Sequence, residues 1–173
     1  MQGETVNDWH AIGTPFGVYH AEIGPRGLRA LHFPGTAETI DTDLLSEASC
    51  VHARTLRDQL VRYHNGSLTR FDIALDPNGA TVFRRRVWSA MQAIPYGATV
   101  TYGELAKAIG CRSARAIGQA CGANPIPVII PCHRVIAANG RLGGWSGKPG
   151  MKERLLRLES SRLGDSFHSA CKS

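Results

Sequence analysis

The chain has 173 residues, 43% of them hydrophobic, and a formal net charge of +6, which indicates a globular protein of one ordinary domain or two small ones. Its five cysteines include no Cys-x-x-Cys pair, so neither a disulfide framework nor a clustered zinc site is indicated, and a reducing cytosol fits best. There is no basic start followed by an apolar stretch and no run of about 18 apolar residues, so neither export nor a membrane span is expected.

The charge is divided unequally along the chain. Residues 1–80 carry 6 Lys/Arg and 10 Asp/Glu, whereas residues 81–173 carry 14 Lys/Arg and 4 Asp/Glu. An asymmetry of this kind suggests a domain that meets a polyanion such as nucleic acid, although a basic surface is just as often a solvated face.

The first half predicts a β-rich segment followed by a helix. Residues 9–33 contain short alternating runs broken by Gly and Pro, which predict a meander of hairpins. Apolar side chains recur at helical spacing in residues 46–63, and residues 71–75 alternate like a further strand. The turn at residues 76–79, next to the change in charge, predicts a domain boundary near residue 79.

The second half begins with helical patterns. An apolar stripe predicts a helix over residues 83–94, and Thr101 with Glu104 has the capping-box spacing that starts a second, short helix. Ser113 can cap a third helix that runs to about Cys121. Two short helices joined by a tight turn are typical of a helix-turn-helix, with the second as the recognition helix.

That recognition helix has small side chains where a sequence-reading helix would have long ones. After Ser113 it offers Ala114, Ala116 and Gly118 with a single long cation, Arg115. The minor groove is about 6 Å wide and a helix with side chains is roughly 10–12 Å across, so only a helix with very small residues approaches it closely. The pattern therefore favours contact with the minor groove, and the alternative is a helix packed tightly inside the domain.

A cysteine and a histidine stand side by side in IIPCHRVI, residues 129–136. A cysteine has an ordinary pKa of about 8.5 and is only a few per cent thiolate at neutral pH, so a nucleophilic Cys132 needs a base. In an extended segment the side chain of His133 would point to the opposite face, so a bridging water or a turn would be required. Glu159 is the favoured carboxylate to orient the histidine, because this half has few acidic residues. The alternative is a buried, unreactive thiol.

The segment after the cysteine predicts a turn and a glycine-rich loop. Residues 138–141 form a hairpin turn of the type that a DNA-binding wing uses. The loop at residues 142–150 carries Trp145, which can stack on a base, and Ser146, which can hydrogen-bond it. These are the ingredients of a pocket for an extruded nucleotide, and a plain surface loop is the alternative.

Three stretches, residues 86–110, 115–136 and 155–159, resemble the O6-alkylguanine-DNA alkyltransferases, also called methylated-DNA–protein-cysteine methyltransferases, whose signature is PCHRV. The resemblance covers about residues 70–160 closely. It implies an α/β fold in which residues 1–79 form a ribonuclease-H-like antiparallel sheet plus helix. Residues 80–162 would form a mostly helical, winged helix-turn-helix domain for DNA binding and catalysis, and residues 163–173 a flexible tail.

The resemblance also implies roles for matching residues. Cys132 looks like the nucleophile that takes the alkyl group, and His133 with Glu159 looks like the water-linked relay that makes the thiolate. Asn124 resembles the asparagine that braces the hinge between the recognition helix and the active-site segment. Tyr102 resembles the tyrosine that protonates the departing guanine and crowds the phosphate so that the nucleotide rotates outward.

On the DNA-binding helix, Arg115 resembles the finger that enters the base stack and occupies the vacated space. Trp145 stands where many relatives carry a tyrosine, and the loop ending at residues 147–150 departs from the usual one, so the pocket is expected to be narrowed or reshaped. The pocket for the alkylguanine is expected to be lined by Tyr102, Val135, Trp145, Ser146 and Gly147.

The implied function is DNA repair. The protein would flip O6-alkylguanine out of duplex DNA through the minor groove and transfer the alkyl group irreversibly to its own cysteine, once per molecule. It would need no cofactor, act as a free monomer in the cytoplasm with the nucleoid DNA, and have no membrane partner, while clustering along DNA is left open. The metal site of some relatives is not expected, because the candidate ligands are scattered: His10, His20, His32, Cys50, His52 and His64.

Two other functions compete with this one. A cysteine hydrolase would use Cys132 and a histidine to form an acyl-enzyme, but it explains neither the helix-turn-helix nor the basic half. A sensor that flips the base without chemistry is the other alternative, but family-like sensors lack the cysteine. For single residues, Tyr102 is alternatively a helix-surface tyrosine and Glu159 a solvated charge, and Arg134 is interpreted as a structural ion-pair partner.

Overall fold

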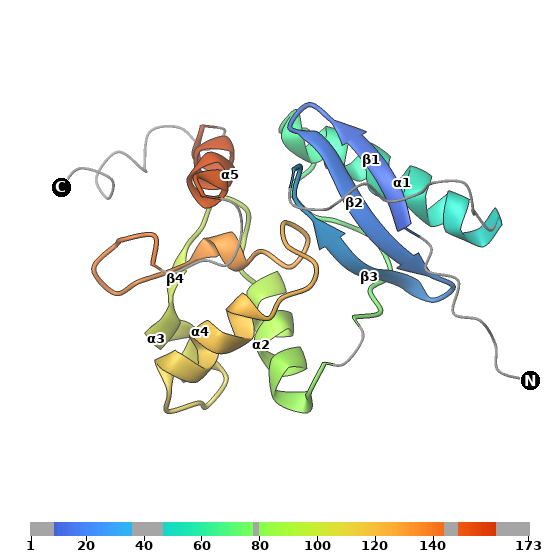
Figure 1. The fold of residues 1–173 in the computed structure, drawn as a ribbon. Coiled ribbons are helices and arrows are strands. Elements are labelled where there is room, and N and C mark those ends of the chain that lie inside the picture. Colours follow the sequence, from blue (N-terminus) through green and yellow to red (C-terminus); the bar gives the residue numbers. More distant parts are fainter. Residues whose placement is uncertain (1–8, 36–46, 78–79, 144–148, 162–173) are drawn as a thin grey trace, which may run out of the picture. The chain divides into compact units, whose positions relative to one another are not determined.

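The computed structural model describes residues 9–35, 47–77, 80–143 and 149–161 (Figure 1). The chain divides into two compact units, Met1–Asn78 and Gly79–Ser173. Both strands and helices are present, so the fold is of the mixed α/β kind.

The first unit is a three-stranded antiparallel sheet with one helix. Strands β1 (Trp9–Thr14), β2 (Gly17–Gly24) and β3 (Gly27–His32) pair in chain order, and α1 (Glu47–His64) packs against β1 and β2 (Figure 1). The predicted meander and the predicted helix are confirmed.

Alternation along β2 explains how this sheet and helix hold together. Tyr19, Ala21 and Ile23 are buried and face the same side, because successive side chains of a strand point to opposite faces. Leu56 and Leu60 of α1 are also fully buried. The unit is therefore held mainly by apolar packing between one face of the sheet and one stripe of the helix.

The strand expected at residues 71–75 is not formed. Gln59 of α1 donates its side-chain amide to the carbonyl of Asp72 at 2.6 Å and accepts from the amide of Asp72 at 2.8 Å. Because these backbone groups are satisfied by a side chain, they make no strand ladder, and only an isolated bridge joins Leu28 to Leu75. Gly27 allows the close approach there, since a Cβ at this position would collide with the carbonyl of Ala74.

The second unit is built from short helices around a two-stranded parallel sheet. Its elements are α2 (Val82–Gln92), β4 (Val100–Thr101), α3 (Tyr102–Ala108), α4 (Ala114–Gly122), the 3-10 helix η1 (Cys132–Arg134), β5 (Val135–Ile136) and α5 (Met151–Ser160).

Side-chain caps fix where three of these helices begin. Thr81 accepts from the amide of Arg84 at 3.2 Å. The predicted capping box is confirmed, because Thr101 accepts from the amide of Glu104 and the Glu104 carboxylate accepts from the amide of Thr101. The predicted cap at Ser113 is confirmed as well, since its hydroxyl accepts from Ala116 at 3.1 Å.

Helices α2, α3 and α4 pack together to form the support for the site. Val87 and Met91 of α2 and Ile117 of α4 are fully buried, and the indole of Trp88 donates to the carbonyl of Ala120 at 2.9 Å. The buried apolar stripe of α2 thereby fixes the helix pair that leads to residue 124.

The segment after η1 differs from a hairpin wing in the part that the structure describes. Strand β5 pairs in parallel with β4, with Val100 opposite Val135. The expected turn is present, because Ala137 donates its amide to the carbonyl of Arg141 at 2.9 Å, but no strand is formed between residues 137 and 143. Separately, no helix among the described residues has the length and apolar character that crossing a bilayer requires.

Candidate active site

The backbone that leads to Cys132 is held by Asn124. The side chain of Asn124 donates to the carbonyl of Ile130 at 2.8 Å and accepts from the amide of Ile126 at 3.0 Å, so it closes a compact loop. Within the loop, Val128 has a φ of 74°, a left-handed conformation that is rare for a β-branched residue. Such strain persists only where the surroundings fix the chain, so Cys132 follows a rigid segment.

Cys132 begins a 3-10 turn, not an extended segment. Its amide donates to the carbonyl of Ile130 at 2.8 Å, and the amide of Arg134 donates to the carbonyl of Pro131 at 3.0 Å. The side chain of Cys132 is buried, with 3% of its surface exposed. The backbone therefore makes the turn that the sequence analysis named as one of the two arrangements, and this turn is compatible with a bridging water between the two side chains.

His133, Arg134 and Glu159 form one buried cluster in which Glu159 is the common acceptor. Nε2 of His133 lies 2.8 Å from Oε1 of Glu159, and the guanidinium of Arg134 donates to both carboxylate oxygens at 2.9–3.3 Å. The amide of Gly97 donates to Oε2 at 2.9 Å. Glu159 is thus fully buried and not the solvated charge of the alternative interpretation. The expected structural ion pair of Arg134 is confirmed.

These contacts decide the protonation of the cluster. Burial would raise the pKa of Glu159, but the hydrogen bonds and charges of His133 and Arg134 outweigh it and lower that pKa to about 2. Burial also lowers the pKa of His133, although Glu159 opposes this effect. The cluster therefore holds an ionised carboxylate beside a neutral imidazole. Because a carboxylate only accepts, Nε2 of His133 carries the proton, and Nδ1 is the nitrogen able to act as a base.

Lys152 also belongs to this region, although it was not among the site residues predicted from the sequence. Its ammonium donates to the carbonyls of Val135 at 2.7 Å and Leu142 at 2.5 Å, and only 3% of the residue is exposed. Burial lowers the pKa of Lys152, whereas negative charge on Cys132 or Cys121 raises it, so the ammonium lies within electrostatic reach of the thiol. The signal was present in the sequence, since Lys152 lies on the buried stripe of α5.

Tyr102 is the first residue of α3, and its hydroxyl stays protonated. Burial, together with smaller contributions from negative charge on Cys121 and Cys132, raises its pKa to about 12. The ammonium of Lys152 lies 5.9 Å from the centre of its ring. A Cβ on Gly143, where φ is 69°, would come within 3.2 Å of the ring. Tyr102 is therefore a partly buried hydroxyl donor next to the cysteine and not a surface tyrosine.

The predicted DNA-binding residues occupy the start of α4. Ser113, Ala114 and Arg115 are exposed, whereas Ala116 and Gly118 are half-buried. Nothing lies within 4 Å of a Cβ placed on Gly118, so the surface over this residue is open. The helix packs through its other side, with Ile117, Ala120 and Cys121 buried. One face of α4 is therefore open, which argues against the alternative of a helix packed tightly inside the domain.

The predicted alkylguanine pocket is described only in part. Tyr102 is near Cys132, and Val135 is fully buried directly after the 3-10 turn. Trp145, Ser146 and Gly147 lie outside the described residues.

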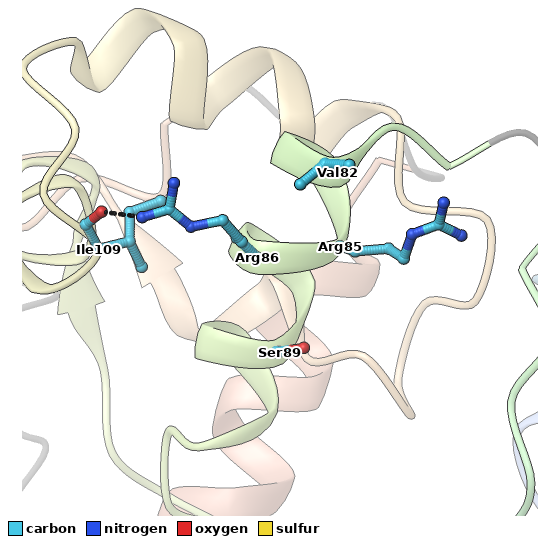
Figure 2. Close-up of a pocket in the computed structure, with 5 residues that line it drawn as sticks. All are labelled: Val82, Arg85, Arg86, Ser89 and Ile109. Carbon is cyan, nitrogen blue, oxygen red and sulfur yellow. Dashed lines mark hydrogen bonds between the residues drawn. The ribbon is translucent and has the colours of Figure 1, made fainter.

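A surface hollow of about 430 Å³ is lined mainly by residues of α2 and contains none of the predicted site residues. Within it, the guanidinium of Arg86 donates to the carbonyl of Ile109 at 2.8 Å, at the end of α3, while Arg85 points away from that pair (Figure 2). This contact ties α2 to α3. The hollow is lined by Val82, Arg85, Arg86, Ser89 and Ile109.

Comparison with known proteins identifies the family. Residues 82–161 match the family model described as the DNA-binding domain of 6-O-methylguanine DNA methyltransferase. A methylated-DNA–protein-cysteine methyltransferase of Methanosarcina acetivorans is 40% identical over 154 residues, which cover 84% of this chain and 98% of that protein. The chain belongs to the methylated-DNA–protein-cysteine methyltransferase family.

Other members of the methyltransferase family match as well. The protein of the same name from Mycobacterium bovis is 54% identical over 106 residues, but this match spans only 61% of the chain and 64% of that relative. The crystal structure of Mycobacterium tuberculosis OGT in complex with DNA has a TM-score of 0.76 and 41% identity, covering 89% of this chain and 93% of that one. Family membership and the fold therefore extend over both units.

Proposed function

We propose that this protein repairs DNA by transferring the alkyl group of an O6-alkylguanine irreversibly to its own Cys132. The observation that carries the proposal is the buried cluster around Cys132: a neutral imidazole on an ionised carboxylate, in a chain of the methylated-DNA–protein-cysteine methyltransferase family. A thiol needs a base to become a nucleophile, and this cluster supplies one.

His133 is the base in this proposal. Its Nε2–H donates to Glu159 and fixes the tautomer, so Nδ1 takes the proton of Cys132, through a bridging water as in the proposed relay. The imidazolium that results is stabilised by the carboxylate of Glu159. The ammonium of Lys152 favours the thiolate in the same region.

The thiolate attacks the alkyl carbon in line, the sulfur–carbon bond forms, and the carbon–O6 bond breaks with its electron pair moving to the guanine. Tyr102 carries its proton at neutral pH and donates it to the departing guanine. A thioether remains on Cys132. Because neither water nor disulfide exchange reverses a thioether under cellular conditions, each molecule reacts once.

Double-stranded DNA containing O6-alkylguanine is the proposed partner, and it would meet α4. Helices α3 and α4 are interpreted as a helix-turn-helix whose open, small-residue surface enters the minor groove, while the exposed Arg115 fills the space of the flipped base. Flipping costs a few kcal/mol and is easier when alkylation has weakened the pairing. Asn124 keeps the loop between α4 and Cys132 closed, which supports its proposed role as the hinge brace.

The proposal also includes the fold type of each unit, the position of the base pocket, the oligomeric state and the cellular location. We interpret the first unit as ribonuclease-H-like, since it combines an antiparallel sheet with one helix, and the second as a winged domain. The pocket for the base would lie between Tyr102, Val135 and residues 145–147. The free protein would be a monomer that acts on cytoplasmic DNA.

The experiment that tests this function is intact-protein mass after mixing with a duplex that contains one O6-methylguanine, followed by peptide mapping. We expect a gain of one methylene on the Cys132 peptide, which stops at one per protein. Cys132→Ser should gain nothing. Cys111→Ser is the matched control, because Cys111 is a free cysteine in the turn before α4 and should leave the transfer intact.

The competing functions give different results in the same experiment. Binding of the duplex without any gain in mass would identify a sensor and refute the transfer. Methylation of another cysteine would show that the nucleophile is wrongly assigned. Affinity for undamaged duplex should fall steeply with salt, because it depends mainly on phosphate contacts.

A further inference from the structure

The hollow on α2 lies on the exposed side of that helix, and the proposed alkyl transfer does not use it. Four of its five lining residues come from α2, where they recur at helical spacing and so share one face. The buried residues of α2 lie on a different face, toward α3 and α4. The hollow is therefore a surface feature of the DNA-binding unit whose residues have no assigned role.

The two arginines of the hollow differ in their surroundings. The guanidinium of Arg86 donates to the carbonyl of Ile109 at 2.8 Å, just after the last residue of α3, and a cation at a helix C-terminus is favourable. Arg85 is exposed, points away from this pair, and has no hydrogen bond or ion pair among the described residues (Figure 2). Near the start of α2 a cation opposes the helix dipole, so helix stability does not explain Arg85.

The chemistry of the hollow matches a strand of nucleic acid. Its lining contains two guanidinium groups, one hydroxyl and no acidic side chain. Val82, with 74% of its surface exposed, and Ile109 add apolar surface between them. A DNA strand alternates an anionic phosphate with a mainly apolar sugar, and arginine and serine are common donors to phosphate oxygens. The hollow therefore suits a sugar–phosphate backbone better than a purely apolar partner.

The position of the hollow along the chain favours the same duplex that would meet α4. Ile109 follows α3, and Ser113, which caps α4, comes four residues later. Four residues span at most about 14 Å. A duplex carries one phosphate per about 3.4 Å of its axis on each strand. A duplex that lies on the start of α4 therefore has phosphates at the distance of this hollow.

We propose that the hollow on α2 binds the sugar–phosphate backbone of the duplex, with Arg85 as the ligand of one phosphate and Ser89 as a second donor. This inference rests on the proposed function, because it takes a duplex on α4 as given. It adds a contact outside the recognition helix that is independent of base and sequence. Since Arg85 is exposed on α2 and Cys132 is buried, the contact raises affinity and leaves alkyl transfer at saturating DNA unchanged.

The first test measures affinity for an undamaged duplex over a series of salt concentrations. Arg85→Gln should weaken binding about fivefold at low salt and make the slope of log affinity against log salt shallower by about 0.9. Arg85→Lys keeps the charge and should keep the slope. Arg84→Gln is the matched control, because Arg84 is also exposed on α2 but does not line the hollow. Equal losses in Arg84→Gln and Arg85→Gln would overturn the proposal, since net charge alone would then explain both.

The second test identifies the phosphate. Single neutral methylphosphonate linkages are placed in turn along each strand of the duplex. At one position the neutral linkage should weaken binding of the unchanged protein and have no effect on Arg85→Gln. If no position behaves in this way, the hollow does not meet a phosphate and the proposal is wrong.

Intact-protein mass separates this proposal from the proposed function. At saturating duplex with one O6-methylguanine, Arg85→Gln should gain one methylene on Cys132 as the unchanged protein does. Transfer by both proteins with equal affinity and equal salt slope would refute only the site on α2. Absence of transfer by the unchanged protein would refute the proposed function.

Discussion

The two units of the protein bury polar side chains of different kinds. Among the described residues, the first unit buries neutral or weakly basic groups, whereas the second unit buries three full charges beside one neutral imidazole. In the first unit these buried polar residues are His10, Gln59 and His64, and in the second unit they are His133, Arg134, Lys152 and Glu159.

This difference shows where the chain accepts an energetic cost. A buried ion pair is weak evidence for stability, because removing two charges from water offsets much of their attraction. The first unit avoids that cost by packing apolar side chains between a sheet and a helix. The second unit accepts it around Cys132, where perturbed protonation is what a nucleophile requires. We therefore expect the two units to respond differently to the same kind of substitution.

The largest effect should come from Glu159→Gln. This change leaves the buried guanidinium of Arg134 without its anionic partner, which typically destabilises a protein by about 3–5 kcal/mol. Alkyl transfer should also slow by about 100-fold or more, since His133 loses the carboxylate that orients it. Urea unfolding and single-turnover transfer measure the two effects.

Glu153→Gln on the same helix is the control. Glu153 pairs with Arg157 at 2.6 Å on the exposed side of α5, and such pairs contribute about 0.3–0.5 kcal/mol. If Glu159→Gln and Glu153→Gln lose the same unfolding free energy, the burial of Glu159 makes no difference to stability and the comparison between the units fails.

Acid should lower the stability of the second unit by protonating Glu159. The pKa of Glu159 is about 2 in the folded protein, against an ordinary value of 4.5, so its stabilisation is complete above pH 4.5 and is lost as the pH falls toward 2. The loss should be on the order of 3 kcal/mol, measured by urea unfolding at a series of pH values. Glu159→Gln should lack this part of the acid dependence, and parallel curves for the two proteins would refute the assignment.

A smaller effect is expected from Lys152→Met. Removing the ammonium makes the thiolate of Cys132 less favourable, so transfer at neutral pH should slow by about tenfold. The difference in transfer rate between Lys152→Met and the unchanged protein should become smaller as the pH rises, because the thiol of Cys132 then loses its proton to hydroxide. Transfer rates across a pH series measure this. Lys107→Met, at the exposed end of α3, should leave the rate unchanged, and an equal loss in both variants would exclude the electrostatic role.

The smallest effect belongs to the first unit. Tyr19→Phe removes the buried hydrogen bond between the hydroxyl of Tyr19 and Nε2 of His64, which are 3.1 Å apart, and should cost about 1 kcal/mol of unfolding free energy. Thermal unfolding measures the cost, and transfer should be unaffected. Ser67→Ala, which loses an exposed hydrogen bond at 3.1 Å, is the control and should be close to neutral. A large loss of alkyl transfer in Tyr19→Phe would contradict the expectation that this hydrogen bond of the first unit affects stability alone.

Much of the local structure could be predicted from the sequence, because its causes are local. A cap needs only a hydroxyl and an amide a few residues apart, so Thr101 and Ser113 predict where α3 and α4 begin. The stripe of α5 likewise places Glu159 on the buried face, although the same stripe also marked Lys152, whose role was missed. The predicted strand at residues 71–75 was wrong because the side chain of Gln59, on the preceding helix α1, hydrogen-bonds both the amide and the carbonyl of Asp72.

By itself, the sequence determined the capped helix starts and the hairpin meander, and it predicted that His133 would be oriented by Glu159 beside Cys132. These depend on spacing of a few residues or on a short motif. Only the tertiary structure decided that Arg134 and His133 share the carboxylate of Glu159, that Lys152 lies near Cys132, and that Arg86 ties α2 to the end of α3. Burial and strand register are set by the packing of segments far apart in the chain, and protonation follows burial, so no local pattern contains them.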